Sequence, residues 1–183
     1  MHRWVSKSIL LLFFTFYCHT SVFAEVSLTG IEPDTIIIPS LSIHASVKGL
    51  SKEEINAVPP DGETVFWYRD GVNPGARGSA MLAGHFDDYE GPAVFFELRQ
   101  INISDMVYLV DKKGEMVMFQ VEEITSFPRK QAPIDEVFQM NGEPRLILVT
   151  CDGAYDKELR THSNRLFVKA RRVGTSHLYF GRV

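Results

Sequence analysis

The sequence predicts an all-β domain, built either as a barrel or as a sandwich. Short apolar or alternating segments recur along the chain, and Gly, Pro and Asn separate them. Long segments with a helical period are nearly absent. A length of 183 residues suits one domain with a short appendage, and 45% apolar and 23% charged residues are ordinary values for a globular protein.

Strand-like segments follow one another from residue 35 to residue 170. Between residues 41 and 47, apolar residues alternate with Ser42, His44 and Ser46, which indicates a half-buried strand with His44 facing solvent. The segment from Asp111 to Glu115 has the composition of a hairpin turn. We expect strands at residues 35–39, 41–47, 65–68, 79–85, 106–110, 116–121, 145–150 and 165–170.

Three short segments favour helix. Ser51 and Glu54 match a capping box, and Pro59 would end the helix that follows. The segment from Ala93 to Arg99 has apolar residues on one helical face, and residues 134–138 form a further candidate. None of the three is long enough to change the all-β class.

The first 24 residues resemble a targeting segment. Arg3 and Lys7 precede an apolar run from Ile9 to Tyr17, and Ala24 ends a group of small residues typical of a cleavage site. This run is shorter than the roughly 20 residues of a membrane span, so a cleaved signal and an uncleaved anchor both stay open. Either would place the domain outside the cytoplasm. We expect a targeting segment at 1–24, a linker at 25–34, the β domain at 35–173 and a tail at 174–183.

The charge of the chain argues against a nucleic-acid partner. The formal net charge is −4, and Arg3 and Lys7 are the only charged side chains among the first 24 residues apart from histidines. The part that follows is therefore more acidic than the whole chain. Such a surface does not suit a general polyanion binder.

Cys151 is the only cysteine after residue 24, and it follows the apolar run from Leu146 to Val149. Asp152-Gly153 predicts a turn, so we expect the strand to end there and to present the thiol at a rim. An unpaired cysteine in an exported protein invites oxidation unless it has a function. The alternatives are a buried inert cysteine or a disulfide with Cys18.

Two other predicted strand ends carry residues that could serve a nucleophilic thiol. A neighbouring imidazole or cation raises the reactivity of a thiol. His85 ends one strand after a glycine, and Arg165 begins the strand after the cysteine, where a guanidinium could stabilise an oxyanion. His162 is the competing histidine. The alternatives are a structural histidine at residue 85 and a surface ion pair for Arg165.

We expect neither a metal nor a cofactor. Asp87, Asp88 and Glu90 form an acidic loop that could bind calcium weakly, but a solvated loop explains it better. No second cysteine lies near Cys151, and no zinc motif occurs in the chain.

Three segments, in this order, resemble the signature segments of sortases. They are Ala83-Gly84-His85, Leu148-Val149-Thr150-Cys151, which is similar to the family's TLxTC motif, and Arg165-Leu166-Phe167-Val168. Each segment alone is a weak indicator of the family, but the three in this order are a specific one. The resemblance covers roughly residues 36–173, and residues 78–98 are especially similar to the class F group.

The resemblance implies a closed eight-stranded β-barrel with one or two short helices. It also implies a cysteine transpeptidase at the outer face of a Gram-positive membrane, either attached through residues 9–24 or released. Its substrates would be surface proteins with an LPXTG-like C-terminal signal. An amine of a peptidoglycan precursor or of a pilin would accept the cleaved protein.

By similarity, Cys151 attacks the carbonyl between Thr and Gly of the signal and forms a thioester. His85 acts as acid and base, and Arg165 holds the substrate and stabilises the oxyanion. Thr150 and Ala83 would belong to the substrate-binding residues.

One departure leaves the subclass open. Many class F relatives place the arginine slightly earlier, where this chain has Ser163, so Arg160 is the alternative to Arg165. Two other functions also fit the residues: an exported β-barrel that binds ligands without catalysis, and a cysteine endopeptidase that only hydrolyses.

Overall fold

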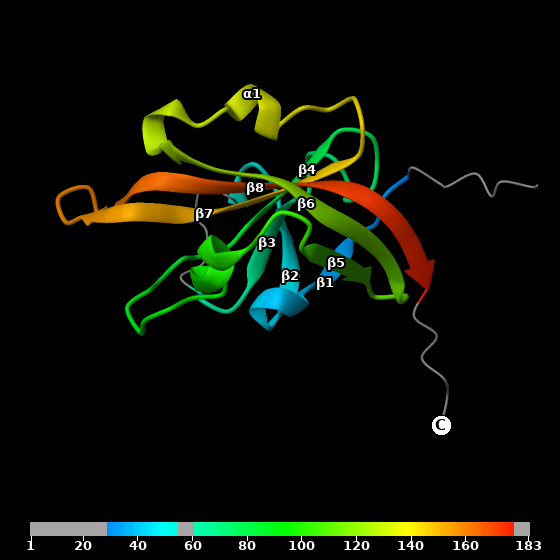
Figure 1. The fold of residues 1–183 in the computed structure, drawn as a ribbon, viewed down its shortest axis with the longest axis horizontal. Coiled ribbons are helices and arrows are strands. Elements are labelled where there is room, and N and C mark those ends of the chain that lie inside the picture. Colours follow the sequence, from blue (N-terminus) through cyan, green and yellow to red (C-terminus); the bar gives the residue numbers. More distant parts are fainter. Residues whose placement is uncertain (1–28, 55–60, 178–183) are drawn as a thin grey trace, which may run out of the picture.

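A computed structural model describes residues 29–54 and 61–177, which form a closed barrel of eight strands (Figure 1). The all-β prediction and the implied eight-stranded barrel are confirmed. The strands are β1 (Pro33–Ile38), β2 (Ile43–Leu50), β3 (Val65–Tyr68), β4 (Ser79–Ala83), β5 (Met106–Asp111), β6 (Glu115–Pro128), β7 (Arg145–Asp156) and β8 (Thr161–His177). The helical elements among the described residues include the 3-10 turns η1 (Pro39–Leu41), η3 (Phe96–Gln100) and η4 (Arg129–Gln131) and the short helix α1 (Ile134–Val137).

The order of strands around the barrel is β1-β2-β3-β4-β7-β8-β6-β5. Most neighbours are antiparallel, but β4 and β7 run parallel, with Ala83 opposite Val149. β7 and β8 are antiparallel, with Cys151 opposite Arg165. Parallel neighbours end at the same edge of a sheet, so the residues after β4 and those late in β7 lie at one edge of the barrel.

The barrel has apolar residues on both sides of its wall. The interior is filled by fully buried side chains, among them Leu82, Phe95 and Phe119. A second, smaller apolar cluster consists of Met81, Val137, Ile147 and Phe167. Val137 belongs to α1, which Figure 1 draws above β6, β7 and β8. This second cluster therefore lies on the outer face of the barrel.

β7 and β8 continue past the barrel wall as a two-stranded hairpin, which projects to the left in Figure 1. The prediction of a turn at Asp152-Gly153 is wrong. Gly153 has a φ of +78°, and the register of β7 against β8 shifts between Asp152 and Tyr155. Some bulges and some tight turns both need a residue with positive φ, which glycine adopts readily, so the Asp-Gly pair is compatible with either. Cys151 consequently lies within the β7–β8 ladder and not at the end of a strand.

Two other elements are longer than the sequence indicates. β6 begins near the expected position but runs on to Pro128, with a register shift between Val121 and Glu123. β8 extends to His177 and so includes the first residues of the expected tail. Both extensions belong to the β6–β8 ladder, whose long-range pairing is not visible in local composition.

The capping box predicted at Ser51 is present. The Ser51 N–H donates to the Glu54 carboxylate at 2.8 Å, and the Glu54 N–H donates to Ser51 Oγ at 3.3 Å. The helix expected to follow lies largely outside the described residues, as do the targeting segment and the end of the tail. Within residues 29–54 and 61–177, no helix has the length and apolar character of a membrane span.

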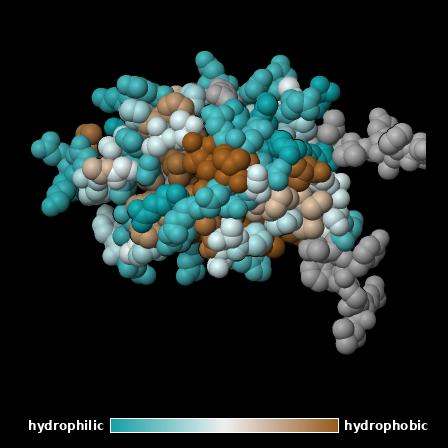
Figure 2. All heavy atoms as spheres, in the orientation of Figure 1, coloured by the Kyte–Doolittle hydropathy of each residue, from teal (hydrophilic) through white to brown (hydrophobic). Residues whose placement is uncertain are grey.

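The surface is mostly hydrophilic on the face that Figure 2 shows. A hydrophobic area lies near the middle of that face, bordered by hydrophilic residues. Figure 1, in the same orientation, draws β6 and β8 crossing in this part of the barrel.

Candidate active site

The three residues predicted for the site lie on three adjacent strands or directly after them. Cys151 in β7 is directly opposite Arg165 in β8. On the other side of β7, the parallel register pairs Ala83 with Val149, and the Gly84 N–H continues it by donating to the Val149 carbonyl at 3.1 Å. Continued two residues past the end of β4, the same register would set His85 opposite Cys151. The tertiary structure thus brings the predicted histidine, cysteine and arginine to one edge of the barrel.

The segment that carries His85 is held from several sides. Thr150 Oγ1 donates to the Gly84 carbonyl at 2.8 Å, and the Phe95 N–H donates to the His85 carbonyl at 2.9 Å. The His85 ring meets the Phe66 ring edge-on, with 6.2 Å between centroids. A Cβ on Gly84 would lie 2.6 Å from the Phe95 ring, so this close approach requires glycine. These contacts fix the position of the His85 backbone, from which the imidazole extends.

Thr150 and Ala83, expected among the substrate-binding residues, lie on opposite faces of the wall. Thr150 is 3% exposed and uses its hydroxyl to hold the Gly84 carbonyl. This contact suits a positioning role for its side chain better than substrate contact. Ala83 packs against the outer cluster together with Val149. It therefore lies on the face that a substrate can approach.

Cys151 is half-buried and makes no disulfide with any described residue. Burial raises the pKa of the Cys151 thiol above its ordinary value, Arg165 lowers it, and Asp87 raises it further. The neutral thiol is therefore favoured at neutral pH. A nucleophilic Cys151 then needs a base that removes its proton, and His85 is the histidine that the strand register brings beside it.

The Arg165 guanidinium is bound to the backbone and side chains of its own strand. Its Nη1 donates to the carbonyls of His162 at 3.1 Å and Asn164 at 2.8 Å, and its Nη2 donates to Thr161 Oγ1 at 3.0 Å. Arg160, the alternative arginine, is exposed in the turn between β7 and β8, where its φ is +50°. The geometry therefore favours Arg165 as the guanidinium that acts next to the thiol.

His162, the competing histidine, is buried and has both ring nitrogens occupied. Its Nε2 contacts the Asp87 carboxylate oxygens at 2.9 and 3.1 Å, and its Nδ1 contacts the Gly153 carbonyl at 3.1 Å. Because both partners are acceptors, neither nitrogen is available to take a proton from Cys151. The prediction from sequence placed Asp87 in a solvated loop and did not include its pairing with His162.

The rest of the acidic loop is stabilised by hydrogen bonds to its own backbone. The Asp88 carboxylate accepts hydrogen bonds from the N–H groups of Glu90 and Gly91 at 2.7 and 3.1 Å. Within the part of the chain that the structure describes, no group of three or more His, Cys, Asp or Glu residues could hold a metal ion.

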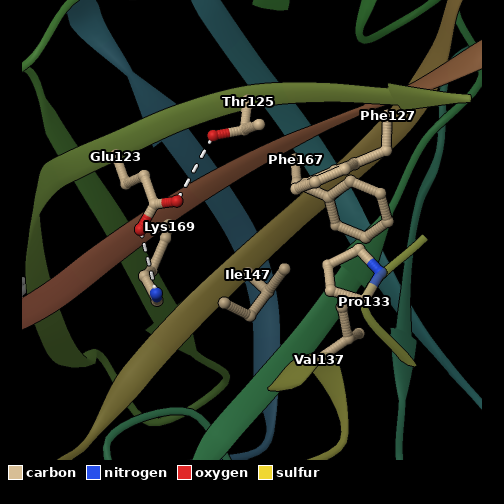
Figure 3. A pocket seen from close by; sticks show the side chains of 8 residues that line it. All are labelled: Glu123, Thr125, Phe127, Pro133, Val137, Ile147, Phe167 and Lys169. Atoms are coloured by element: carbon tan, nitrogen blue, oxygen red, sulfur yellow. Dashed lines mark hydrogen bonds and ion pairs between the residues drawn. The ribbon is translucent and has the colours of Figure 1, made fainter. Parts of the chain in front are cut away.

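A groove lies on the outer face of β6, β7 and β8, beneath the segment that carries α1 (Figure 3). Its lining consists of Glu123, Thr125, Phe127, Pro133, Val137, Ile147, Phe167 and Lys169. Figure 3 shows the apolar side chains at one end and the charged ones at the other. Lys169 Nζ lies 3.0 Å from Glu123 Oε2, and the Lys169 hydrogen bond lowers the pKa of Glu123.

The groove and the thiol share one face of the barrel. Side chains alternate along a strand, so Ile147, Val149 and Cys151 point to the same side of β7. Across β8, Phe167 is opposite Val149 and Lys169 is opposite Ile147. A partly buried thiol, an imidazole in the segment after β4 and a guanidinium opposite the thiol can together carry out nucleophilic acyl transfer. The groove lies along the same strands as the thiol.

The family model described as "Sortase domain" matches residues 36–173 of the chain. No curated protein matches it significantly. Among solved structures, sortase A of Listeria monocytogenes is 18% identical with a TM-score of 0.62, and the match covers 80% of this chain and 90% of that one.

Two further sortase structures match over similar lengths. A lid mutant of sortase A from Corynebacterium diphtheriae is 19% identical with a TM-score of 0.62, covering 76% of this chain and 69% of that one. Sortase C-1 from Actinomyces oris is 22% identical with a TM-score of 0.61, covering 79% and 76%. At these identities, the solved structures support the fold.

Proposed function

We propose that this chain, which belongs to the sortase family of cysteine transpeptidases, cleaves an LPXTG-like C-terminal signal between Thr and Gly. The single observation that supports this most strongly is the placement of Cys151 opposite Arg165, with His85 following β4 at the same edge. The protein joined to the thiol is then passed to an amine. Neither the binding-module nor the endopeptidase alternative gains support from the family match.

The spacing of residues along β7 supports a peptide of this kind. Ile147 and Val149 lie four and two residues before Cys151, which corresponds to roughly 13 and 7 Å along a strand. In an extended LPXT segment the Leu lies three residues before the Thr, or roughly 10 Å away. With the Thr carbonyl at Cys151, the Leu side chain would reach the apolar end of the groove. Phe167 and Val137 line that end.

The proposed reaction has two halves. His85 takes the proton of Cys151, and the sulfur attacks the carbonyl carbon of the Thr–Gly bond. Arg165 stabilises the negative charge that develops on the oxygen. His85 then gives the proton to the leaving Gly nitrogen, the C–N bond breaks, and a thioester remains on Cys151.

An amine resolves the thioester in the second half. His85 removes a proton from the incoming amine, whose nitrogen attacks the thioester carbonyl, and the Cys151 sulfur leaves and recovers a proton. The acceptor amine is proposed to belong to a peptidoglycan precursor or to a pilin. Sortases are cell-surface or membrane-associated enzymes, and we propose that residues 9–24 direct this chain to the outer face of a Gram-positive membrane. The class F assignment stays a prediction.

Mass spectrometry of the intact enzyme tests this function. The enzyme is incubated with an LPXTG peptide and should gain the mass of the acyl fragment on Cys151, located by peptide mapping. Addition of triglycine should remove the adduct and yield the peptide–triglycine product. Hydrolysis alone, unaffected by triglycine, would indicate the endopeptidase. Absence of both an adduct and cleavage would contradict the proposed substrate, and a peptide with Ala in place of Leu is the matched control.

A further inference from the structure

His162 and Asp87 connect the two parts of the chain that carry the proposed site. Asp87 lies two residues after His85, and His162 lies in β8 three residues before Arg165. Their side chains meet at 2.9 and 3.1 Å, although they are 75 residues apart in sequence. This pair therefore fastens the loop after β4 to the hairpin that contains Cys151 and Arg165.

The remaining contacts of His162 reach β7 and Arg165 as well. Its Nδ1 lies 3.1 Å from the Gly153 carbonyl, two residues after Cys151, and its own carbonyl accepts a hydrogen bond from Arg165 Nη1 at 3.1 Å. The imidazole is 6% exposed. One residue thus touches the loop of His85, the strand of Cys151 and the guanidinium of Arg165.

The partners of the His162 ring fix the orientation of the imidazole. Its Nε2 faces the Asp87 carboxylate and its Nδ1 faces the Gly153 carbonyl. A carboxylate and a backbone carbonyl accept hydrogen bonds but do not donate them. The ring therefore lies between two acceptors, one from the His85 loop and one from β7.

Aromatic side chains contact the imidazole, whereas the Asp87 side chain is 42% exposed. The rings of Phe86 and Tyr155 meet the imidazole edge-on, with 5.1 and 5.3 Å between centroids. Arg99 of η3 stacks over Phe86 at 4.9 Å. The titratable and charged groups around His162 are therefore Asp87 from the loop, Tyr155 and Cys151 from β7, Arg165 from β8 and, behind Phe86, Arg99 from η3.

We propose that His162 and Asp87 are positioning residues of the transpeptidation site, which hold the His85 loop against the Cys151 strand and place the Asp87 carboxylate near the thiol. This inference rests on the proposed function for its consequence in turnover. Its electrostatic part concerns Cys151 alone and holds without any substrate.

The Asp87 carboxylate allows its charge to be separated from the contact it makes. Asp87 is one of the groups that raise the pKa of the Cys151 thiol. Asp87→Asn removes that negative charge, whereas His162→Gln leaves it in place. The first change should therefore lower the pKa of the thiol, and the second should leave it nearly unchanged. Both changes weaken the same contact, so loss of the contact alone would shift the pKa of the thiol alike in the two variants.

The test measures the rate of Cys151 alkylation by iodoacetamide as a function of pH. Wild type is compared with Asp87→Asn, His162→Gln and the double variant. The Asn oxygen can still accept from the imidazole and the Gln amide can still donate to the carboxylate, so each single variant keeps one hydrogen bond. Asp88→Asn is the matched control, because the Asp88 carboxylate caps backbone N–H groups and does not contact His162.

We expect the midpoint of alkylation to fall in Asp87→Asn and in the double variant, and to stay close to wild type in His162→Gln. Shifts in the same direction in both single variants, or no shift in either, would overturn the proposal. For an LPXTG peptide, both single variants should lose kcat by up to about 10²-fold with a smaller change in KM, because the reacting groups are misplaced. Asp87→Glu should recover part of this loss.

Two features of the experiment distinguish a failure of this inference from a failure of the proposed function. Alkylation needs no peptide, so a wild-type enzyme that fails to cleave the peptide contradicts the proposed function and leaves the test of the pair intact. If His162→Gln does not fold, Asp87→Asn decides alone: an unchanged midpoint together with unchanged turnover would overturn the inference.

Discussion

The two faces of β7 differ in what they contribute. On the inner face, Leu146 and Leu148 are fully buried in the main core, and Thr150 is 3% exposed. On the outer face, Ile147 and Val149 belong to the smaller cluster under α1, and the half-buried Cys151 follows them. Because side chains alternate along a strand, one segment of six residues can stabilise the barrel and line the site at the same time. Substitutions on the two faces should therefore affect stability and activity separately.

Cys151→Ala should produce the largest effect on the outer face. Without the thiol no thioester forms, so cleavage of an LPXTG peptide should fall to background. The free energy of unfolding should change by only about 1 kcal/mol, because the side chain is small and half-buried. Peptide cleavage and urea unfolding measure the two quantities. Measurable turnover by this variant would exclude Cys151 as the nucleophile.

Arg165→Ala should give the next largest loss. Removal of one donor to a developing oxyanion costs about 2.7–4 kcal/mol of transition-state stabilisation, or about 10²–10³ in kcat. Arg160→Ala is the matched control, since Arg160 lies exposed in the hairpin turn. We expect nearly normal kcat in that variant. The reverse pattern would transfer the role to Arg160.

Leu148→Ala and Ile147→Ala compare the faces directly. Leu148 is fully buried in the main core, so its truncation should lower the free energy of unfolding by about 3 kcal/mol and leave the KM of the folded enzyme unchanged. Ile147→Ala should cost less, about 2 kcal/mol, because the short α1 can settle over the gap, and should raise KM for the peptide. Equal KM values in both variants would argue against the groove as the peptide site.

Thr150→Val should give the smallest change. It removes the hydroxyl that donates to the Gly84 carbonyl and should lower the free energy of unfolding by about 1 kcal/mol. A several-fold loss of kcat should accompany it, because the His85 segment loses one support. Thr150→Ser keeps the hydroxyl and should behave like wild type. If Thr150→Val raises KM and leaves kcat unchanged, Thr150 contacts the substrate instead.

Sequence patterns predicted the strands well where neighbouring residues alone define the strand. Alternation at residues 41–47 and the apolar runs at 65–68 and 145–150 all correspond to strands. Asp152-Gly153 was misjudged because its composition suits a bulge as well as a turn, and only pairing with β8 decides between them. The full lengths of β6 and β8 depend on the same kind of long-range pairing.

The sequence by itself determined the all-β class, the candidate residues His85, Cys151 and Arg165, and the resemblance to sortases, because these depend on composition, period and motif. Only the tertiary structure decided which residues meet. The register of β7 and β8 puts Arg165, and not Arg160, opposite Cys151. The closed barrel brings Asp87 to His162 across 75 residues, a contact that has no local signature because it arises from the packing of distant strands.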